Sequence, residues 1–413
     1  MMNKYFPIKT DTACQLKWTW STIWLYGGWT ASCHRIRPEH ISIENFHNFH
    51  NTEKKLADRQ LMLDGKWPTG GCEYCQHVEE AGGSSDRQLH LTQTDILPIE
   101  LETDPTATTV TPRILEVYLN NTCNFSCVYC GGYHSSVINT ENEKHIKFLD
   151  NKDYYDTFEN LRVFPGTEEN YFKPFIEYLK HNGQGLKNLN VLGGEPFYQK
   201  EFDQLLDFFN EHPFPNLELS INTNLGIKKE KLIQYCEQIR QLIAKKKIKR
   251  FDLTASIDCW GPEQEYVRAG LDIEQWEENF NYLLEQRWIV LKINQTISVL
   301  TIKTMPTLLE KLAEWRKKRK VGHFFSAVTP HPYYLMPTIL GGDVFKQDFE
   351  TILSLMPDVT DDDKNAIIYM KGIATQIEKS KPNLEQINNL KIFLDELDRR
   401  RNTNWRKLFP WIQ

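Results

Sequence analysis

The chain has 413 residues, of which 25% are charged, and a formal net charge of -6. This length fits one large domain plus a smaller one and allows a sizeable buried core. The charge balance and the absence of a basic tract argue against nucleic acid as a partner. No apolar run is long enough for a signal peptide or a membrane-spanning helix, so the sequence predicts a soluble cytoplasmic protein with no membrane contact.

Nine cysteines fall into two groups and two single positions. In a large cytoplasmic chain they are not expected to form disulfides. The two groups predict two metal sites, and the single residues Cys236 and Cys259 predict packing positions. The first group consists of Cys14, Cys33, Cys72 and Cys75, and the second of Cys123, Cys127 and Cys130.

The chain divides into four segments by composition. Residues 1–91 are rich in Trp, His and Cys and show no long periodic helix, so we expect a compact Cys-rich domain there. The Thr- and Pro-rich stretch 92–112 reads as an extended linker. Residues 113–345 alternate strand and helix patterns, and residues 346–413 form a polar, helical extension.

The alternating segment predicts an α/β fold. Six apolar strands are expected at 114–120, 188–192, 217–222, 251–258, 289–298 and 323–328. Apolar residues at helical spacing predict a helix after each of the first five strands, at 172–182, 201–212, 231–246, 276–287 and 308–318. Right-handed crossovers between parallel strands wind this pattern into a sheet or a partial barrel, so we expect a partial (β/α)6 TIM-like barrel.

Polar residues follow the predicted strands one after another. Chemistry in such folds lies beyond the carboxyl ends of the strands, so these residues are expected to meet at one mouth. They are Cys123–Cys130 after the first strand, Gly193–Pro196 after the second, Asn222–Asn224 after the third, Ser256 and Asp258 after the fourth, Asn294, Gln295 and Ser298 in the fifth, and His331 after the sixth.

The stretch "NTCNFSCVYCGGY" places three cysteines at C-x3-C-x2-C spacing. Thiolates are soft ligands for iron–sulfur clusters and for zinc. Three of them can hold three irons of a [4Fe–4S] cluster and leave the fourth iron open. The alternative is a zinc site with a distant fourth ligand such as His134.

Four segments, in order, resemble the radical S-adenosylmethionine (radical SAM) enzymes over residues 114 to about 335. "CNFSCVYC", with Tyr129 before its last cysteine, is similar to the cluster loop of that family. "LGGEP" is similar to the segment near the SAM amino group, "SINTN" to the segment near the ribose, and "SIDCWGPEQEYVRAG" to a segment whose Ser and Arg hold the SAM carboxylate.

The resemblance implies a role for each matching residue. Cys123, Cys127 and Cys130 would hold the cluster, and Gly193 and Gly194 would let the backbone come close to SAM. Glu195 would offset the SAM ammonium, and Asn222 and Asn224 would lie near the ribose. Ser256 and Arg268 would bind the carboxylate. The implied reaction is reductive cleavage of SAM to a 5'-deoxyadenosyl radical, which abstracts a hydrogen atom from the substrate. Cys259 could donate a hydrogen atom to a substrate radical, but a small buried residue is the favoured interpretation.

The N-terminal cysteines lie in two pairs, which favours a metal site filled by zinc or by an auxiliary [4Fe–4S] cluster. His34 could replace one thiolate. The segment resembles the twitch or SPASM type of auxiliary-cluster extension, here placed before the barrel, through Trp67, Cys72, Cys75, Gly83 and Arg87. A cluster with four cysteines would carry electrons or shape the substrate pocket. The tryptophans at 18, 20, 24 and 29 could line a pocket, but core packing is the favoured interpretation.

These observations predict a two-cluster radical SAM enzyme. Family analogy favours a ribosomally made peptide or a protein as substrate, modified by crosslinking, epimerisation or backbone excision. We expect a separate leader-binding partner to deliver it and an electron donor such as flavodoxin or ferredoxin. The alternatives are a radical SAM enzyme of small molecules and, in another class, a zinc- or iron–sulfur-binding electron-transfer protein without SAM chemistry.

Overall fold

The computed structural model describes residues 10–80, 85, 87, 88, 106, 108–167, 169–328, 331–358 and 361–412. Most of the predicted linker and Gly83 lie outside these residues. No helix among them is long and apolar enough to cross a membrane.

The described part of the chain builds a nine-stranded sheet and a second sheet of two short strands. The strands of the large sheet are β1 (Trp20–Trp24), β2 (Trp29–Ala31), β3 (Glu39–His40), β4 (Ile114–Tyr118), β6 (Asn188–Leu192), β7 (Phe214–Thr223), β8 (Ile248–Ser256), β10 (Ile289–Ile297) and β11 (Gly322–Ala327), and the small sheet consists of β5 (Ser126–Cys127) and β9 (Arg268–Ala269).

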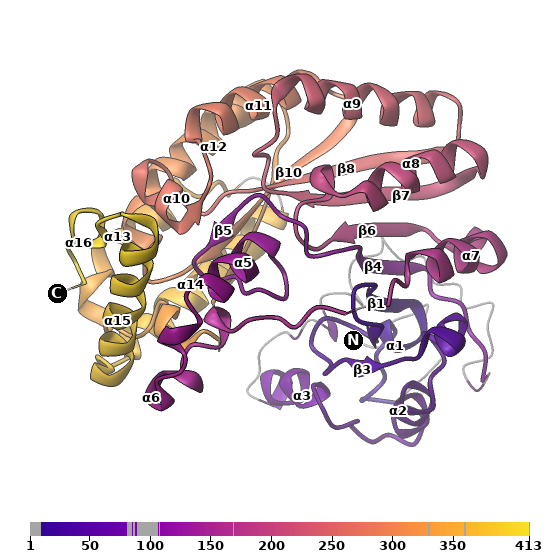
Figure 1. Cartoon of the computed structure of the whole chain (residues 1–413), viewed down its shortest axis with the longest axis horizontal. Coiled ribbons are helices and arrows are strands. Elements are labelled where there is room, and N and C mark those ends of the chain that lie inside the picture. The colour runs from indigo at the N-terminus through magenta and orange to yellow at the C-terminus, as the bar shows by residue number, and fades with distance from the viewer. Residues whose placement is uncertain are drawn as a thin grey trace.

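Six strands of the large sheet are parallel and lie side by side in chain order, from β4 to β11. They coincide with the six predicted strands to within three residues. The helices that connect them arc around one side of the sheet (Figure 1). They are α7 (Phe172–Asn182), α8 (Lys200–Glu211), α9 (Lys229–Ala244), α11 (Ile273–Glu285) and α12 (Met305–Lys318). This arrangement confirms an α/β fold with a large parallel sheet.

The two faces of the parallel strands differ in chemistry. Along β10 every second residue is buried, which is the pattern of a strand with one face against helices. The opposite face carries polar side chains that neighbour one another by register: Thr22 beside Glu116, Glu116 beside Asn190, Asn190 beside Ser220, and Ser220 beside Asp252. We call this the inner face of the sheet.

The N-terminal region continues the same sheet. Strand β1 pairs with β4 in parallel, and β2 and β3 follow as antiparallel strands. Ile23, Leu25 and Phe49 of this region belong to the main hydrophobic core. A second, smaller core surrounds Trp18 and the N-terminal cysteines Cys14 and Cys72, with Trp20 and Trp24 packed against it.

Two helices of the N-terminal region depart from the expectation of a segment without long helices. They are α2 (Glu53–Leu63) and α3 (Cys72–Glu80), and a single turn, α1 (Leu16–Thr19), precedes β1. The buried residues of α2 are Lys55, Asp58, Arg59 and Met62. They have helical spacing, but three of the four are charged, so hydrophobic periodicity could not reveal the helix.

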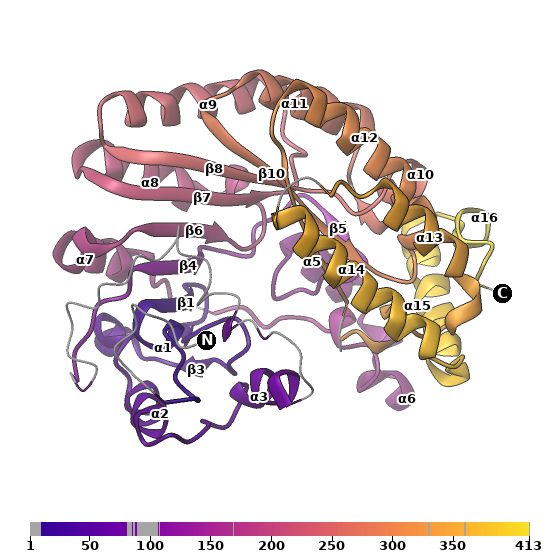
Figure 2. The same ribbon diagram turned by 180° about the vertical axis from the view of Figure 1, so that it is seen from behind.

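Helices between and after the strands complete the fold. They are α5 (Ser136–Lys144), α6 (Lys152–Tyr155), α10 (Pro262–Val267), α13 (Lys346–Leu355), α14 (Asp361–Lys379), α15 (Leu384–Arg401) and α16 (Trp405–Leu408). The last four lie in the segment for which the sequence predicts a helical extension. They gather at the opposite end of the molecule from α7, as both ribbon views show (Figures 1 and 2).

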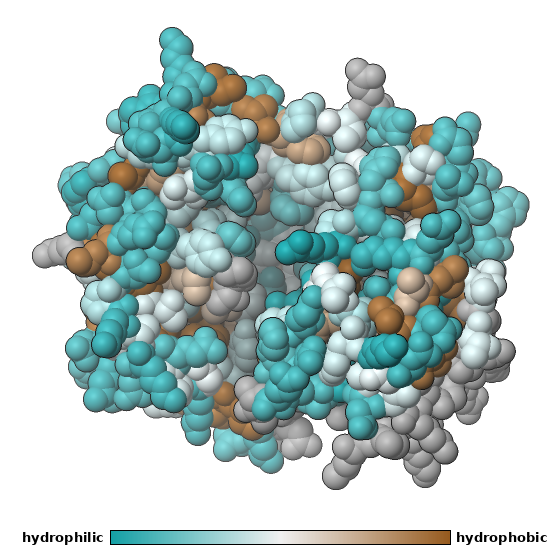
Figure 3. Space-filling view, turned by 90° about the horizontal axis from the view of Figure 1, so that it is seen from below, coloured by the Kyte–Doolittle hydropathy of each residue, from teal (hydrophilic) through white to brown (hydrophobic). Residues whose placement is uncertain are grey.

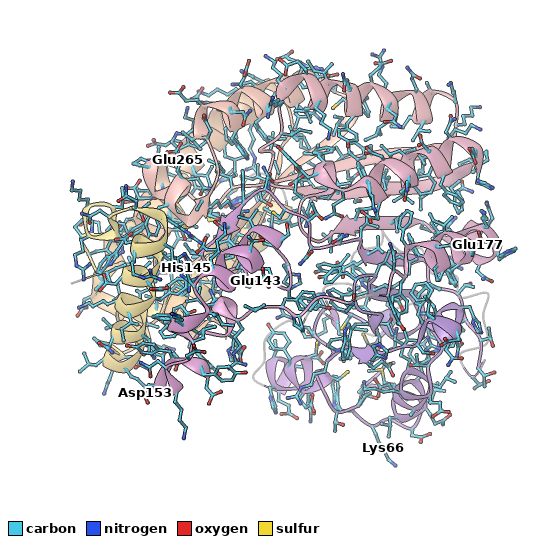
Figure 4. The ribbon with its side chains drawn as sticks, in the orientation of Figure 1. Lys66, Glu143, His145, Asp153, Glu177 and Glu265 are labelled. Atoms are coloured by element: carbon cyan, nitrogen blue, oxygen red, sulfur yellow. The ribbon has the colours of Figure 1, made fainter. Side chains whose placement is uncertain are left out.

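The helical extension packs against α5, the helix that follows the three-cysteine stretch. Glu141 of α5 pairs with Arg401 of α15, with Nε and Oε2 3.2 Å apart. His145 directly follows α5, and its Nδ1 lies 3.2 Å from Nη2 of Arg399 in α15. Figure 4 labels His145. Seen from below, a hollow separates the half that carries these helices from the half that carries the N-terminal region (Figure 3).

Candidate functional site

The three-cysteine stretch forms a loop whose middle is pinned by a short sheet. Cys127 of β5 pairs with Arg268 of β9 in antiparallel register. The Val128 amide also donates to the Val267 carbonyl at 2.9 Å, and the Cys130 amide to the Cys127 carbonyl at 3.0 Å. We call residues 121–133 the cluster loop. The sequence segments predicted to hold the cluster and the SAM carboxylate are therefore joined through their backbones.

The three thiols of the cluster loop lie within electrostatic range of one another. Burial raises the pKa of Cys130, and the charges of Cys127 and Cys123 raise it further. Burial, followed by the charge of Cys127, raises the pKa of Cys123 to about 12. Mutual repulsion of this kind disfavours three free thiolates and is relieved when a cation binds all three. This donor set fits the irons of a cluster.

The "GGEP" segment packs directly on the cluster loop. The Glu195 amide donates to the Thr122 carbonyl at 2.8 Å. Gly194 has a φ of +51°, and a Cβ there would lie 2.1 Å from the Thr122 carbonyl oxygen. Gln199 donates its side-chain amide to the carbonyls of Asn120, Thr122 and Gly193. Only glycine fits this approach of residue 194 to the cluster loop.

Glu195 is a buried carboxyl group in a fixed orientation. Its oxygens accept hydrogen bonds from the Thr223 hydroxyl at 2.8 Å and from the backbone amide of Asn224 at 2.6 Å. Burial raises the pKa of Glu195 and these hydrogen bonds lower it, and the net result is a pKa of about 7. No cation is in hydrogen-bond contact with Glu195 among the contacts of the described residues. Such a carboxylate gains most from a ligand that brings its own positive charge.

The two predicted asparagines are placed differently. Asn224 follows β7, donates to Asn124 of the cluster loop at 2.8 Å and lies 3.8 Å from the Cys123 sulfur. Asn222 lies on the inner face of the sheet, in register with Thr254 of β8. Ser256, two residues further along β8, shares that face. The structure therefore brings Asn224 to the loop and leaves Asn222 and Ser256 on the surface that leads to it.

Arg268 is engaged by Asp258. Its Nε and Nη2 donate to the two carboxylate oxygens at 2.8 and 2.9 Å, and both side chains are buried. Asp258 also accepts from the Tyr129 hydroxyl at 2.7 Å and from the Thr296 amide at 2.8 Å. Desolvation lowers the pKa of Arg268, but the charge of Asp258 outweighs it and the pKa is raised. These two hydrogen bonds use Nε and Nη2, so Nη1 is the guanidinium nitrogen that Asp258 does not contact.

Asp258 is expected from the sequence only as a polar residue after the fourth strand, and the structure gives it a larger part in this site. It is fully buried and joins the cluster loop, through Tyr129, to Arg268 and to β10. Its position two residues after Ser256 and ten before Arg268 was the available signal. Gln199, three residues beyond Pro196, is a second residue that was missed and carried no sequence signal.

The four N-terminal cysteines surround one cavity of about 430 Å³, part of which is open to solvent. Apolar side chains, among them Leu16, Ile36, Met62 and Trp67, form much of the remaining wall. Burial raises the pKa of Cys14 and Cys33, and it raises the pKa of Cys72 to about 11. Four soft donors around a cavity in an apolar wall fit a metal group bound by thiolates.

Local structure brings the two cysteine pairs together. The Arg37 amide donates to the Gly70 carbonyl at 3.0 Å. A Cβ on Gly71 would lie 2.3 Å from the Arg35 carbonyl oxygen, so only glycine lets the start of α3 approach the segment after Cys33. Glu73 accepts from the amides of Gly70 and Gly71 at 2.8 and 2.6 Å. The stretch from Trp67 to Cys72 thus builds one wall of the cavity.

Within the described residues no three His, Cys, Asp or Glu side chains are placed to hold a single metal ion. A tetrahedral zinc site requires sulfurs about 3.8 Å apart. His34 also lines the N-terminal cavity, whereas the Nδ1 of His134, the other considered ligand, lies 3.2 Å from the Tyr26 hydroxyl.

The single cysteines are packing residues, as predicted. Cys236 is buried on α9. Cys259 is completely buried, with its sulfur 3.5 Å from Gln264 Oε1. Cys259 therefore does not face the inner face of the sheet, and its burial agrees with the favoured interpretation of a small packing residue. Gln295 is likewise buried, where it donates to the Asp258 carbonyl at 2.6 Å rather than facing a ligand.

A scan against protein-family models finds no match, and a search of the curated proteins finds none either. Among solved structures, the chain is similar to SuiB of Streptococcus suis bound to S-adenosylmethionine, with 13% identity over 92% of this chain and 69% of SuiB and a TM-score of 0.37. It is also similar to SuiB bound to the precursor peptide SuiA, with 14% identity over 92% of this chain and 69% of SuiB and a TM-score of 0.35. A third similar structure is anSMEcpe with bound AdoMet and the Kp18Cys peptide, with 15% identity over 59% of this chain and 59% of anSMEcpe and a TM-score of 0.36.

Since the TM-scores lie below 0.5, the functional proposal depends on the residues of the two sites.

Replacing Gly194 with Ala is expected to displace the cluster loop, because the new Cβ would overlap the Thr122 carbonyl and φ is positive. We expect a loss of about 1–3 kcal/mol of stability and a reduced iron content at this loop. Gly185→Ala is the matched control, since a Cβ there meets nothing within 4 Å. Thermal unfolding and iron analysis of both variants check this. Equal iron content in the two would contradict the role of Gly194.

The pKa of about 7 for Glu195 predicts pH-dependent binding of a cationic ligand. The carboxylate is protonated as the pH falls through 7, so its attraction for an ammonium group is lost at lower pH. We expect SAM to bind roughly five- to tenfold more weakly at pH 6 than at pH 7.5. Calorimetry of the wild type against Glu195→Gln measures this. The variant is expected to bind weakly without that pH dependence, and equal pH profiles would exclude Glu195 as the group responsible.

Proposed function

We propose that the chain is a radical SAM enzyme that acts on a peptide or protein. The observation that carries this proposal is the way the cluster loop is held. Its three thiols lie between two segments bonded to its backbone, one carrying the buried Glu195 and the other the Arg268–Asp258 pair. This places a soft tridentate site beside an anionic group and a cationic group, which suits a ligand carrying both an ammonium and a carboxylate.

In this proposal each residue has a separate task. Cys123, Cys127 and Cys130 hold a [4Fe–4S] cluster with one open iron. Glu195, oriented by Thr223 and the Asn224 amide, receives the ammonium of SAM, and the ammonium keeps it ionised at neutral pH. The free Nη1 end of Arg268 and the Ser256 hydroxyl receive the carboxylate, while Asn222 and Asn224 lie toward the ribose.

The bound groups supply the chemistry, which is one-electron cleavage of SAM and hydrogen-atom abstraction from the substrate. The chain fixes the geometry. Asp258 holds Arg268 by two hydrogen bonds and Tyr129 by a third, so the carboxylate-binding side cannot drift away from the cluster loop. Burial of Glu195 and Asp258 keeps water from competing for their ligands.

A peptide is the substrate class that the surface favours. The inner face of the sheet is polar across β1, β4, β6, β7 and β8, and the hollow of Figure 3 separates the two halves of the molecule. An open approach of this kind accommodates a chain better than a closed pocket does. An external one-electron donor such as flavodoxin or ferredoxin and a separate leader-binding protein complete the proposal.

The N-terminal cavity is proposed to hold an auxiliary [4Fe–4S] cluster through Cys14, Cys33, Cys72 and Cys75. The support for this proposal is that all four cysteines line one cavity whose remaining wall is largely apolar. With four cysteine ligands such a cluster has no open iron and would transfer electrons or shape the substrate site.

Cys127→Ala is expected to abolish formation of 5'-deoxyadenosine, because the cluster loses one of three ligands. The assay is anaerobic incubation with SAM and a chemical reductant, followed by chromatography and mass spectrometry. Cys236→Ala removes a thiol from the core of α9 and serves as the control, with product formation retained. Undiminished 5'-deoxyadenosine from Cys127→Ala would overturn the proposed function.

A further inference from the structure

A buried lysine lies in the wall of the N-terminal cavity. Lys17 is 2% exposed and lines the cavity together with all four cysteines. Lysine is almost never this deeply buried unless it is paired. Nothing in the metal-site prediction from the sequence included it, because a single lysine three residues after a cysteine has no recognisable pattern.

The structure holds Lys17 firmly in this position. Its ammonium binds Asp58 of α2, with Nζ and Oδ2 2.5 Å apart. Its amide donates to the Cys14 carbonyl at 3.1 Å, and its carbonyl accepts from Arg59 Nε at 2.8 Å. The charge is therefore anchored at both ends of the residue and cannot swing out to solvent.

The surroundings give this charge a strong effect. Four thiolates around one site leave any bound iron–sulfur cluster with a net negative charge in an apolar wall, where electrostatic interactions are little screened. The positive charge of Lys17 lowers the pKa of Cys14, Cys33 and Cys72 against the opposing effect of burial. Burial alone would disfavour the thiolates that a metal group requires.

The two arginines of the cavity wall have partners of their own: Arg35 lies over the Tyr74 ring, 4.2 Å from its centroid. Arg87 binds both carboxylate oxygens of Glu79 and donates to the Ala13 carbonyl at 2.7 Å. Asp58, by contrast, has a second cation beside it, since Lys54 lies 3.5 Å from the same oxygen. Asp58 therefore offsets only part of the positive charge on its side of the cavity.

We propose that Lys17 is a positioning residue that sets the reduction potential of a cluster in the N-terminal cavity. This inference rests on the auxiliary cluster of the proposed function. Adding one electron from an external donor takes a [4Fe–4S] cluster with four thiolates from a net charge of about -2 to about -3. A fixed ammonium in the wall stabilises the more negative state, so it raises the potential, and Asp58 moderates that effect.

The test uses the full-length protein with Cys123, Cys127 and Cys130 replaced by Ala, so that only the N-terminal cysteine group can hold a cluster. Iron and sulfide are measured first, and the midpoint potential is then measured by EPR-monitored titration with dithionite. Lys17→Met is expected to shift the midpoint to more negative values. Lys17→Arg keeps the positive charge, so its midpoint potential is expected to stay close to that of the protein with Lys17. Lys54→Met, which removes a more exposed cation beside the same carboxylate, is the control and is expected to cause a smaller shift.

Asp58→Asn gives an independent check with the opposite sign. It keeps Lys17 and removes the negative charge that offsets it, so the midpoint is expected to move to more positive values. This variant decides the question if Lys17→Met fails to assemble a cluster. Unchanged midpoints in Lys17→Met and Asp58→Asn, or shifts of the same sign in both, would overturn the role of Lys17. Absence of iron from the background protein before any change at Lys17 would instead refute the auxiliary cluster, and the inference with it.

Discussion

The contact on which the candidate site depends is the close approach of Gly194 to the carbonyl of Thr122. A glycine with positive φ lets the end of β6 lie against the cluster loop, and the Glu195 amide then bonds that same carbonyl. The opposite side of the loop is paired to β9 through Cys127 and Arg268. The cluster loop is therefore bonded to neighbouring segments on two sides.

Buried charge is the second constraint, and it is handled differently at the two sites. At the cluster loop, Asp258 and Arg268 neutralise each other, whereas Glu195 keeps a raised pKa and only neutral donors. At the N-terminal cavity, Lys17 and Asp58 form a pair beside thiols whose pKa values are raised by burial. Both sites thus carry a group whose charge becomes favourable when a partner of opposite charge arrives, which is typical of binding sites more than of cores.

The parallel strands β4 to β11 and the helices between them could be predicted from the sequence because they have clean apolar periods. The N-terminal region could not. Its strands are short, and the inward face of α2 consists largely of Lys55, Asp58 and Arg59, which make polar contacts inside the protein. Lys55 binds Ser21, Thr30 and the Phe49 carbonyl, a pattern that no hydrophobic count reveals. Nor could the sequence indicate that β1 would join the sheet beside β4, since the stretch between them includes the poorly periodic segment 92–112.

The candidate residues divide in the same way. Those in contiguous motifs, such as Cys123–Cys130 and Gly193–Glu195, were predictable because each motif is a local chain conformation. Asp258, Gln199 and Lys17 act through contacts between distant segments, for example Lys17 with Asp58, so their roles required the tertiary structure. The four N-terminal cysteines are intermediate: their number predicted a shared site, and the structure places them around one cavity.

The central claim is that the two cysteine groups hold two separate clusters. Its most direct test is anaerobic iron and sulfide content per chain in three proteins: the wild type, a variant with Ala at Cys123, Cys127 and Cys130, and a variant with Ala at Cys14, Cys33, Cys72 and Cys75. We predict about eight irons in the wild type and about four in each variant. A wild type without iron, or iron content unchanged when Cys123, Cys127 and Cys130 are removed, would contradict the account. About four irons in the wild type, with zinc retained after loss of those three cysteines, would contradict the second cluster.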